Sequence, residues 1–217
     1  MTIQLHYDSG TAAMIPHILL EELGVPYQRV LVQRAQQQHK DPAFLKLNPN
    51  GLLPVLVDGD LVLYEAAAIA LHLCDTHPQS RLAPAPGTAE RAHFYKWLVW
   101  LTNTLQPALL AYFYPERWVK EGNAEGAAEV KARAQEKVVG LLAQLDELLA
   151  RSGGPWALGS AFSALDAYVF TLCRWTRNFG QGKARERTHL GPYLQRVSER
   201  ASVQRVFAAE GLSAPFF

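Results

Sequence analysis

The 217-residue sequence has few cysteines, two in all, and no surplus of either charge. Cys74 and Cys173 are too far apart for a disulfide framework or a zinc motif, so we expect buried free thiols in a reducing compartment. His72 and His77 are five residues apart, which does not place them on one helical face, and no metal site is expected. The formal net charge of +1 excludes a bulk attraction to nucleic acid or anionic membrane.

The sequence also lacks export, membrane and common catalytic motifs. No basic stretch followed by an apolar run opens the chain, and the most apolar region, 97–114, is interrupted by polar residues and Pro107. The motifs G-x-G-x-x-G, H-E-x-x-H and G-x-S-x-G are absent, as is a phosphate-binding lysine loop. We therefore predict a cytoplasmic protein without nucleic-acid or membrane partners.

One local excess of positive charge lies between Arg174 and Arg187, where five basic residues face only Glu186. A solvated helix end followed by a loop is the favoured interpretation of such a run. The alternative is an anion-attracting rim beside a binding cleft.

The first third of the chain alternates strand-like and helical patterns. Period-two apolar segments are separated by turn residues, and apolar residues at helical spacing end at Gly24. The hairpin signal Asp58-Gly59 joins two further strand patterns. This arrangement predicts a thioredoxin-like α/β domain, with strand 3–7, helix 12–23, strand 27–32, strands 53–57 and 61–63, and a helix opened by Glu65.

The rest of the chain is predicted to be helical. A proline-rich segment, 78–87, is the expected linker, so the predicted domains are 1–77 and the all-helical 88–217. The long amphipathic pattern 88–114 contains Pro107, which removes a backbone donor and predicts a kink. The composition of 124–151 strongly favours a helix. Further helices are expected from about Ser163 and near Leu190.

Two features suggest a receptor for an amino-acid head group. Proline in a strand has no ladder donor, so Leu53-Pro54 indicates either an edge strand or a cis bond. A cis bond would leave the backbone of Leu53 free to pair with an extended peptide. Glu65 opens a helix, where its carboxylate could bind an ammonium while the N–H groups of Ala66 and Ala67 bind a carboxylate. Interaction with the helix dipole alone is the alternative for Glu65.

Ser163 and Asp166 have the spacing of a capping box, which is a folding signature rather than a catalytic one. With this box, the sequence resembles the cytosolic glutathione S-transferase superfamily over nearly its whole length and is most similar to bacterial beta-like members. Each element alone is unspecific, and the combination in this order is specific. The elements are 7–24, the turn 48–51, Leu53-Pro54, 64–66 and the capping box.

The resemblance implies the glutathione transferase fold, glutathione as co-substrate, a cis bond before Pro54, and a homodimer whose sites border the subunit interface. It places the γ-glutamyl end on Glu65 and Ala66 and the cysteinyl backbone on Leu53. Gln36 or Gln37 lies where a basic residue often holds the glycyl carboxylate, which an amide binds more weakly. The implied glutathione-binding residues are Ala12, Gln37, Leu53, Pro54, Glu65, Ala66, Asn103 and Gln106.

The sequence departs from beta-like members in the groups that activate the thiol. The thiolate is the reactive form, and the cysteine position of these members falls on Ala12, while Gln106 stands where similar proteins carry a histidine. The remaining donors are Thr11, Tyr7 and Ser9, preferred in that order, and the first backbone N–H groups of the helix. A helix-capping role is the alternative for Thr11. The helix dipole alone would lower a thiol pKa by about half a unit, so we expect weak catalysis.

The electrophile is expected between the first helix and the helical domain, in an apolar pocket with few polar groups. Trp175 is the best placed by resemblance, and about half of the aromatic candidates are expected to be core instead. The candidates are Tyr112, Phe113, Trp118 and Trp175, with Tyr114 and Phe179.

These observations predict a detoxification-type transferase that adds glutathione to small hydrophobic electrophiles. The enzymatic alternatives are a glutathione-dependent peroxidase, isomerase or disulfide reductase. A non-catalytic glutathione-binding or partner-binding protein is the alternative from a different class, and the loss of a thiol at Ala12 favours it.

Overall fold

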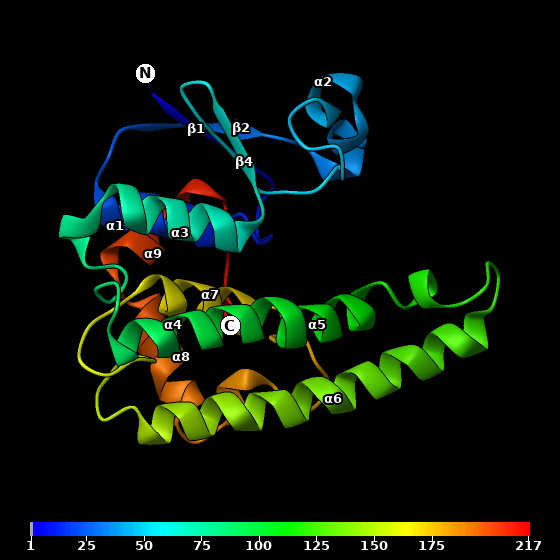
Figure 1. Ribbon diagram of the computed structural model, residues 1–217. Helices are drawn as coiled ribbons and strands as arrows, with labels where there is room; N and C mark the ends of the chain where they lie inside the picture. The colour runs from blue at the N-terminus through cyan, green and yellow to red at the C-terminus, as the bar shows by residue number, and fades with distance from the viewer. Residues whose placement is uncertain (1) are drawn as a thin grey trace.

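The computed structural model describes residues 2–217 and contains a small α/β layer beside a larger helical layer (Figure 1). Four strands form one sheet in the order β2-β1-β3-β4. β1 pairs parallel with β2 and antiparallel with β3, and β3 and β4 form an antiparallel hairpin. The strands are β1 (Ile3–Tyr7), β2 (Tyr27–Leu31), β3 (Val55–Asp58) and β4 (Leu61–Tyr64).

Helices α1 (Met14–Leu23) and α3 (Ala66–Thr76) lie between the sheet and the helical layer (Figure 1). They cover the face to which β1 turns its buried side chains, with Leu5 at its centre. The short α2 (Pro42–Leu45) contributes Phe44 to a second, small apolar cluster. The predicted thioredoxin-like fold is confirmed, and α2 is a short additional helix that the sequence analysis did not predict.

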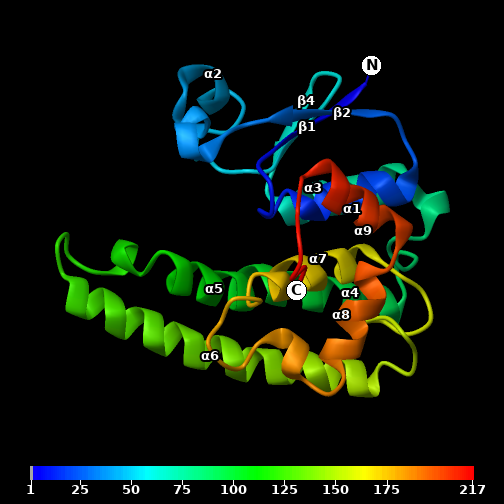
Figure 2. The same cartoon turned by 180° about the vertical axis from the view of Figure 1, so that it is seen from behind.

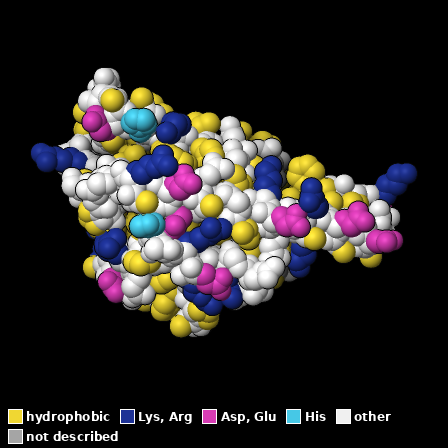
Figure 3. Space-filling view, turned by 90° about the horizontal axis from the view of Figure 1, so that it is seen from below, with side chains coloured by type: hydrophobic (Ala, Val, Ile, Leu, Met, Phe, Trp, Pro, Cys, Tyr) yellow, Lys and Arg dark blue, Asp and Glu magenta, His cyan; other side chains and the backbone are white. Residues whose placement is uncertain are grey.

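The helical layer is built around α7, every residue of which is buried. α5 and α6 run side by side and project beyond the sheet (Figures 1 and 2). On the underside, charged side chains of both signs are interspersed (Figure 3), as the net charge of +1 predicts. The helices are α4 (Ala89–Trp100), α5 (Gln106–Phe113), α6 (Ala124–Arg151), α7 (Ala164–Arg174), α8 (Leu190–Ser198) and α9 (Ala201–Ala209).

The predicted kink at Pro107 takes the form of a π-helical segment, Leu101–Leu105, between α4 and α5. Proline has no N–H and its ring clashes with the carbonyl four residues earlier, so an α-helical ladder cannot pass through it unchanged. The N–H of Gln106 instead donates to the carbonyl of Leu101, five residues back. Such bulges occur frequently at functional sites, and this one contains Asn103 and is followed directly by Gln106.

Several element boundaries differ from the sequence prediction by one or two residues, and two of them lie at the candidate site. α1 begins at Met14 rather than Ala12, because residues 11–13 form turns. β3 begins at Val55, one residue after the peptide bond between Leu53 and Pro54, which is cis as predicted.

Ion pairs join α1 to α9 across the two layers. Glu22 accepts hydrogen bonds from Arg200 Nε and Nη2, both at 2.7 Å, and from the Ser202 hydroxyl. Both charged side chains are largely buried, and the Arg200 guanidinium also lies 4.0 Å from the centre of the Phe162 ring. Partial burial and two-point geometry make such a pair stronger than an exposed one.

We expect Arg200→Ala to lower the free energy of unfolding by about 1–3 kcal/mol at pH 7. Burial would raise the pKa of Glu22, but hydrogen bonds from Arg200 and Ser202 outweigh it and hold this pKa below its usual value. A depressed carboxyl pKa stabilises the fold above the unfolded pKa, and this contribution disappears as the pH falls through the folded pKa. The pH-dependent part of the loss should therefore shrink below about pH 4.3. Urea denaturation at pH 7 and in acid measures it, with Arg200→Lys as the charge-conserving control, and an equal loss at both pH values contradicts the assignment.

Candidate functional site

The ends of three strands and the first turn of α1 meet at one edge of the sheet. His6 of β1 pairs with Val55, and Val55 pairs with Tyr64. The residues just beyond these pairs are therefore neighbours, namely the loop that follows Tyr7, cis-Pro54 and Glu65. The structure brings together the head-group residues and the thiol-activating loop that the sequence predicted separately.

Glu65 has a backbone conformation that non-glycine residues rarely adopt. Its φ and ψ are 72° and 113°, and it precedes the first helical residue, Ala66. Its carbonyl accepts from Ile69 at 2.9 Å, while its side chain makes no capping bond and is exposed. Unusual backbone geometry of this kind clusters at ligand sites. The side chain is thus free to bind an external cation next to the free N–H groups of a helix N-terminus.

The hydroxyl of Thr11 is engaged within its own turn. It donates to the carbonyl of Asp8 at 2.7 Å and accepts from the N–H of Ala13 at 3.3 Å. These bonds close the turn that precedes α1, whose N-cap residue is Ala13 and not Thr11. Within residues 2–217, the N–H of Ala12 has no protein acceptor. The free donor of the turn is therefore a backbone amide.

Tyr7 and Ser9 are differently placed. The Tyr7 side chain is buried on the α1 side of the sheet, with its ring centre 6.0 Å from that of His17 and 5.7 Å from the Arg29 guanidinium. Ser9 is exposed, and its N–H donates to the Asp8 carboxylate at 3.0 Å. Tyr7 is therefore packed in the core, and Ser9 is exposed on the loop.

Gln106 is held by a residue that the sequence prediction missed. The Tyr168 hydroxyl donates to Gln106 Oε1 at 2.9 Å. Burial, and after it the negative charge of Glu65, raises the pKa of Tyr168. The carboxylate of the head-group site therefore acts electrostatically on a residue of α7. Tyr168 follows the capping box by two residues, but its apolar surroundings in the sequence gave no sign of a polar contact. Asn103 is exposed and accepts from the Thr102 hydroxyl at 3.3 Å.

A basic residue lies near the predicted glycyl-carboxylate position. Gln37 is exposed with φ of 60°, and its amide reaches only its own turn, 3.5 Å from the Arg34 carbonyl. Arg34 itself donates through Nη2 to the Tyr114 hydroxyl at 3.0 Å, which connects the strand layer to the end of α5. The sequence analysis did not name Arg34, although a basic residue three positions before Gln37 could have indicated it.

Four of the aromatic candidates form one chain of ring contacts, in which Tyr112 and Phe113 meet edge to face with ring centres 5.1 Å apart. Phe113 and Trp175 meet edge to face with ring centres 6.4 Å apart, and Trp175 Nε1 donates to the Gly10 carbonyl at 3.1 Å, so both lie next to the loop. Tyr112 packs against Phe179 at 4.2 Å on the α6 side. Trp118 is 64% exposed and pairs with no other aromatic ring in residues 2–217.

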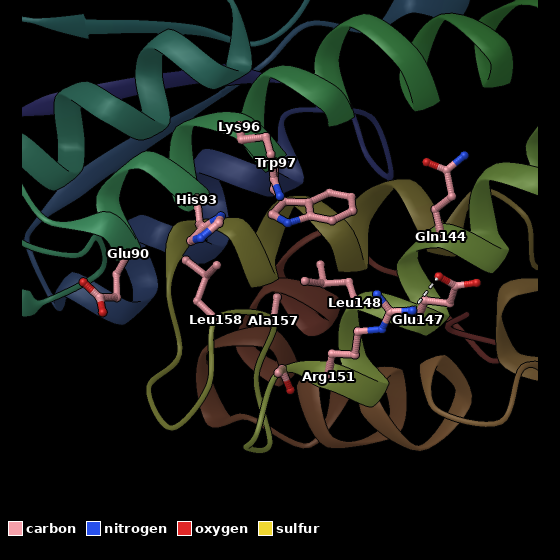
Figure 4. Close-up of a pocket in the computed structure, with 11 residues that line it drawn as sticks. Glu90, His93, Lys96, Trp97, Gln144, Glu147, Leu148, Arg151, Ala157 and Leu158 are labelled. Carbon is pink, nitrogen blue, oxygen red and sulfur yellow. Dashed lines mark hydrogen bonds and ion pairs between the residues drawn. The ribbon is translucent and has the colours of Figure 1, made fainter.

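Two larger cavities lie away from this edge. One of about 520 Å³ opens between α4 and the end of α6, where His93 and Trp97 face Leu148 and Arg151 (Figure 4). Another of about 830 Å³ lies beside segment 78–87. None of the predicted site residues lines either cavity, so neither is the site described above.

Neither a metal centre nor a membrane span is found in the described part of the chain. No group of three or more histidine, cysteine or acidic side chains in residues 2–217 is arranged to hold a metal ion. No helix in the same range combines the length and the apolar composition needed to cross a membrane.

Comparisons with known proteins agree over nearly the whole chain. The Glutathione S-transferase N-terminal domain profile matches residues 4–75, and the C-terminal domain profile matches residues 128–200. Glutathione S-transferase GST-4.5 of Xanthomonas campestris is 28% identical over 97% of this chain and 100% of its own. An uncharacterised GST-like protein of Escherichia coli, YncG, is 31% identical over 80% of this chain and 82% of its own.

Solved structures give the same result. A Sulfitobacter glutathione transferase homolog with bound glutathione superposes with a TM-score of 0.88 at 26% identity and covers 98% of this chain and 99% of its own. A sphingomonad glutathione S-transferase complexed with glutathione has a TM-score of 0.82 at 32% identity and covers 97% of this chain and all of its own. Together with the sheet edge that joins cis-Pro54, Glu65 and the start of α1, these matches show that the chain belongs to the glutathione S-transferase family, as a member of bacterial type.

Proposed function

We propose that the protein binds glutathione and adds its thiolate to small hydrophobic electrophiles, with low activity. The observation that carries this proposal is the meeting of cis-Pro54, Glu65 and the N-terminus of α1 at one sheet edge. Two of the similar structures contain bound glutathione, which supports the same ligand here.

In this proposal each part of glutathione meets one group of residues. The γ-glutamyl ammonium pairs with Glu65, and its carboxylate accepts from the first N–H groups of α3 at Ala66. The cysteinyl backbone pairs with Leu53. The glycyl carboxylate lies near Gln37, with Arg34 supplying the charge that an amide lacks.

The sulfur then lies at the first turn of α1, where the free N–H of Ala12 donates to it. A thiolate accepts this hydrogen bond better than a thiol does, so the contact lowers the thiol pKa, and the helix dipole acts in the same direction. The thiolate attacks the electrophilic carbon beside Phe113 and Trp175, and a carbon–sulfur bond forms as the leaving group departs or the acceptor double bond takes up the electron pair.

The proposal extends to the organisation of the protein. The proline-rich segment 78–87 supports a division into domains 1–77 and 88–217, and the lack of export and membrane motifs supports a cytoplasmic location. The homodimer with sites near the subunit interface follows from the family resemblance. Exposed apolar side chains on the sheet hairpin and α4, such as Val62 and Val99, are available to a second copy.

The test is the ultraviolet absorbance of the thiolate in the glutathione complex as a function of pH, with binding followed by calorimetry. We expect a thiol pKa below the value of about 8.5 of a free thiol. We also expect Thr11→Ala to leave this pKa unchanged, because the hydroxyl is already used by Asp8 and Ala13. A clear rise in Thr11→Ala would make Thr11 the sulfur donor instead.

A non-catalytic glutathione-binding protein is the second candidate, and one observation favours it. Ala12 and Ala13 offer no side-chain donor, and the Thr11 hydroxyl is engaged elsewhere. Glutathione binding with a thiol that titrates as in free solution would support this candidate over the transferase.

A further inference from the structure

Arg174, the last residue of α7, is a buried guanidinium with few partners. The residue is only 2% exposed, and neither Nε nor Nη1 has a hydrogen-bond acceptor within residues 2–217. The interpretation of the basic run as a solvated helix end is wrong for this residue. A guanidinium has five donors, and burying its charge without acceptors is costly. The groups that surround the guanidinium can show what this buried charge does.

Arg174 lies directly under the loop that carries the proposed sulfur site. A Cβ atom on Gly10 would stand 3.2 Å from Arg174 Nη1, and Gly10 has φ of 71°, so no side chain separates the guanidinium from the loop. Two neighbouring groups hold Gly10 in place. Trp175 Nε1 donates to its carbonyl at 3.1 Å, and its N–H donates to Glu210 Oε2 at 2.8 Å.

Two positive groups, Arg174 and Arg177, and two carboxylates, Glu210 and Asp8, surround the loop, and both carboxylates already accept hydrogen bonds. Glu210 is buried and attracts Arg174 through space, but its oxygens are already bonded to His17 Nδ1 at 2.7 Å and to the N–H of Gly10. Arg177 donates to the Arg174 carbonyl at 3.2 Å and adds a second positive charge. Burial, and then Arg177, lowers the pKa of Arg174 to about 10, so the group remains protonated at neutral pH. On the loop itself, the Asp8 carboxylate is bonded to backbone N–H groups of Ser9 and Arg34.

We propose that the buried charge of Arg174 stabilises the glutathione thiolate through the Gly10 loop, in place of the side-chain donor that Ala12 lacks. The inference rests on the proposed function. Gly10 and Ala12 are two residues apart, which puts the guanidinium about 10 Å from a sulfur at the Ala12 N–H. A unit charge at that distance, at an effective dielectric constant of about 20, changes a thiol pKa by about one unit. Arg174 is thus a positioning residue that acts by its field without touching the substrate.

The test compares Arg174→Met, which keeps the length and removes the charge, with Arg174→Lys, which keeps the charge. In the glutathione complex, Arg174→Met should raise the thiol pKa by about one unit, which is a tenfold loss of thiolate well below that pKa. Arg174→Lys should stay near the parent value. Trp175→Phe removes the neighbouring hydrogen bond to the same loop without a change of charge, and it controls for loosening of the loop. Equal pKa values in the two Arg174 variants overturn the proposal, as does an equal rise in Trp175→Phe.

A second readout does not depend on glutathione. Ala12→Cys places a thiol on the loop, and its titration with Arg174 intact and with the added substitution Arg174→Met measures the same field. Burial raises the pKa of Cys74 to about 12, and it also raises that of Cys173, so the native thiols do not interfere near neutrality. If glutathione fails to bind but the Ala12→Cys thiol shifts by about one unit with Arg174, the proposed function fails while the field of Arg174 stands. If glutathione binds and neither thiol shifts, the Arg174 inference alone fails.

Discussion

Replacing Glu65 by alanine is expected to weaken glutathione binding at least about 100-fold, which corresponds to about 2.7 kcal/mol. In the proposed pose the Glu65 carboxylate pairs with the γ-glutamyl ammonium, and hydrogen bonds between charged groups contribute about 1.5–3 kcal/mol. The adjacent N–H groups of α3 would still meet the γ-glutamyl carboxylate. Without Glu65 the ammonium next to it would lose its counter-charge. Calorimetric titration with glutathione, and with an S-alkyl derivative that needs no thiol, measures the change.

The backbone of Glu65 requires a second variant. Its φ of 72° is strained for alanine as it is for glutamate, so Glu65→Gly separates loss of the carboxylate from backbone strain. Both variants should bind equally poorly if the carboxylate is the cause. Glu65→Gln keeps a hydrogen-bond acceptor and should bind at an intermediate level. Glu116→Ala, an exposed carboxylate on the turn after α5, should leave affinity unchanged. Full affinity in Glu65→Ala would refute the head-group assignment.

Features that depend on a few neighbouring residues could be predicted from the sequence. The strand patterns and the hairpin at Asp58-Gly59 follow from local chemistry, and the structure has them. Local chemistry left the bond before Pro54 open between an edge strand and a cis bond, and the family resemblance implied the cis bond that the structure has. The kink at Pro107 was predicted, but its π-helical form was not, because the sequence does not show how far the carbonyls shift. The first turn of α1 was also placed too early, since alanines at 12 and 13 are strong helix formers that the preceding turn overrides.

The contacts that complete the site could not be predicted, because they join distant parts of the chain. The Arg34–Tyr114 and Tyr168–Gln106 bonds span 80 and 62 residues. The loop residue Gly10 is fixed by Trp175 and Glu210, which come from the last quarter of the sequence. Arg174 shows the same limit most clearly. A cluster of basic residues in a polar sequence is normally solvated, but the packing of α7 in the helical layer, with the Gly10 loop against its last residue, buries this one.

The capping box is where a local prediction carries a large energetic consequence. Asp166 is fully buried and accepts four hydrogen bonds, from the N–H groups of Ala157 and Ser163, the Ser163 hydroxyl and the Tyr193 hydroxyl. Burial raises the pKa of Asp166, while these four bonds act in the opposite direction. The sequence predicted the bond to the Ser163 N–H. It did not predict the contacts to Ala157 and Tyr193, which tie the start of α7 to the preceding loop and to α8.

We therefore expect Asp166→Ala to cost about 3–5 kcal/mol, a large part of the roughly 5–15 kcal/mol that stabilises a typical protein. The alanine leaves a cavity and several buried donors without an acceptor, and such donors are penalised by their full desolvation. Urea denaturation of the purified variant, or its recovery as insoluble protein, registers the loss.

Two milder variants test the same contacts in a protein that still folds. Asp166→Asn retains the oxygen that accepts from Ala157 and Tyr193 but turns an N–H₂ toward Ser163, and it should cost less than alanine. Tyr193→Phe removes one hydroxyl and should cost about 1 kcal/mol. If Asp166→Ala cost no more than Tyr193→Phe, the carboxylate would be only a helix cap, and the connection of α7 to its neighbours would have to rest on apolar packing alone.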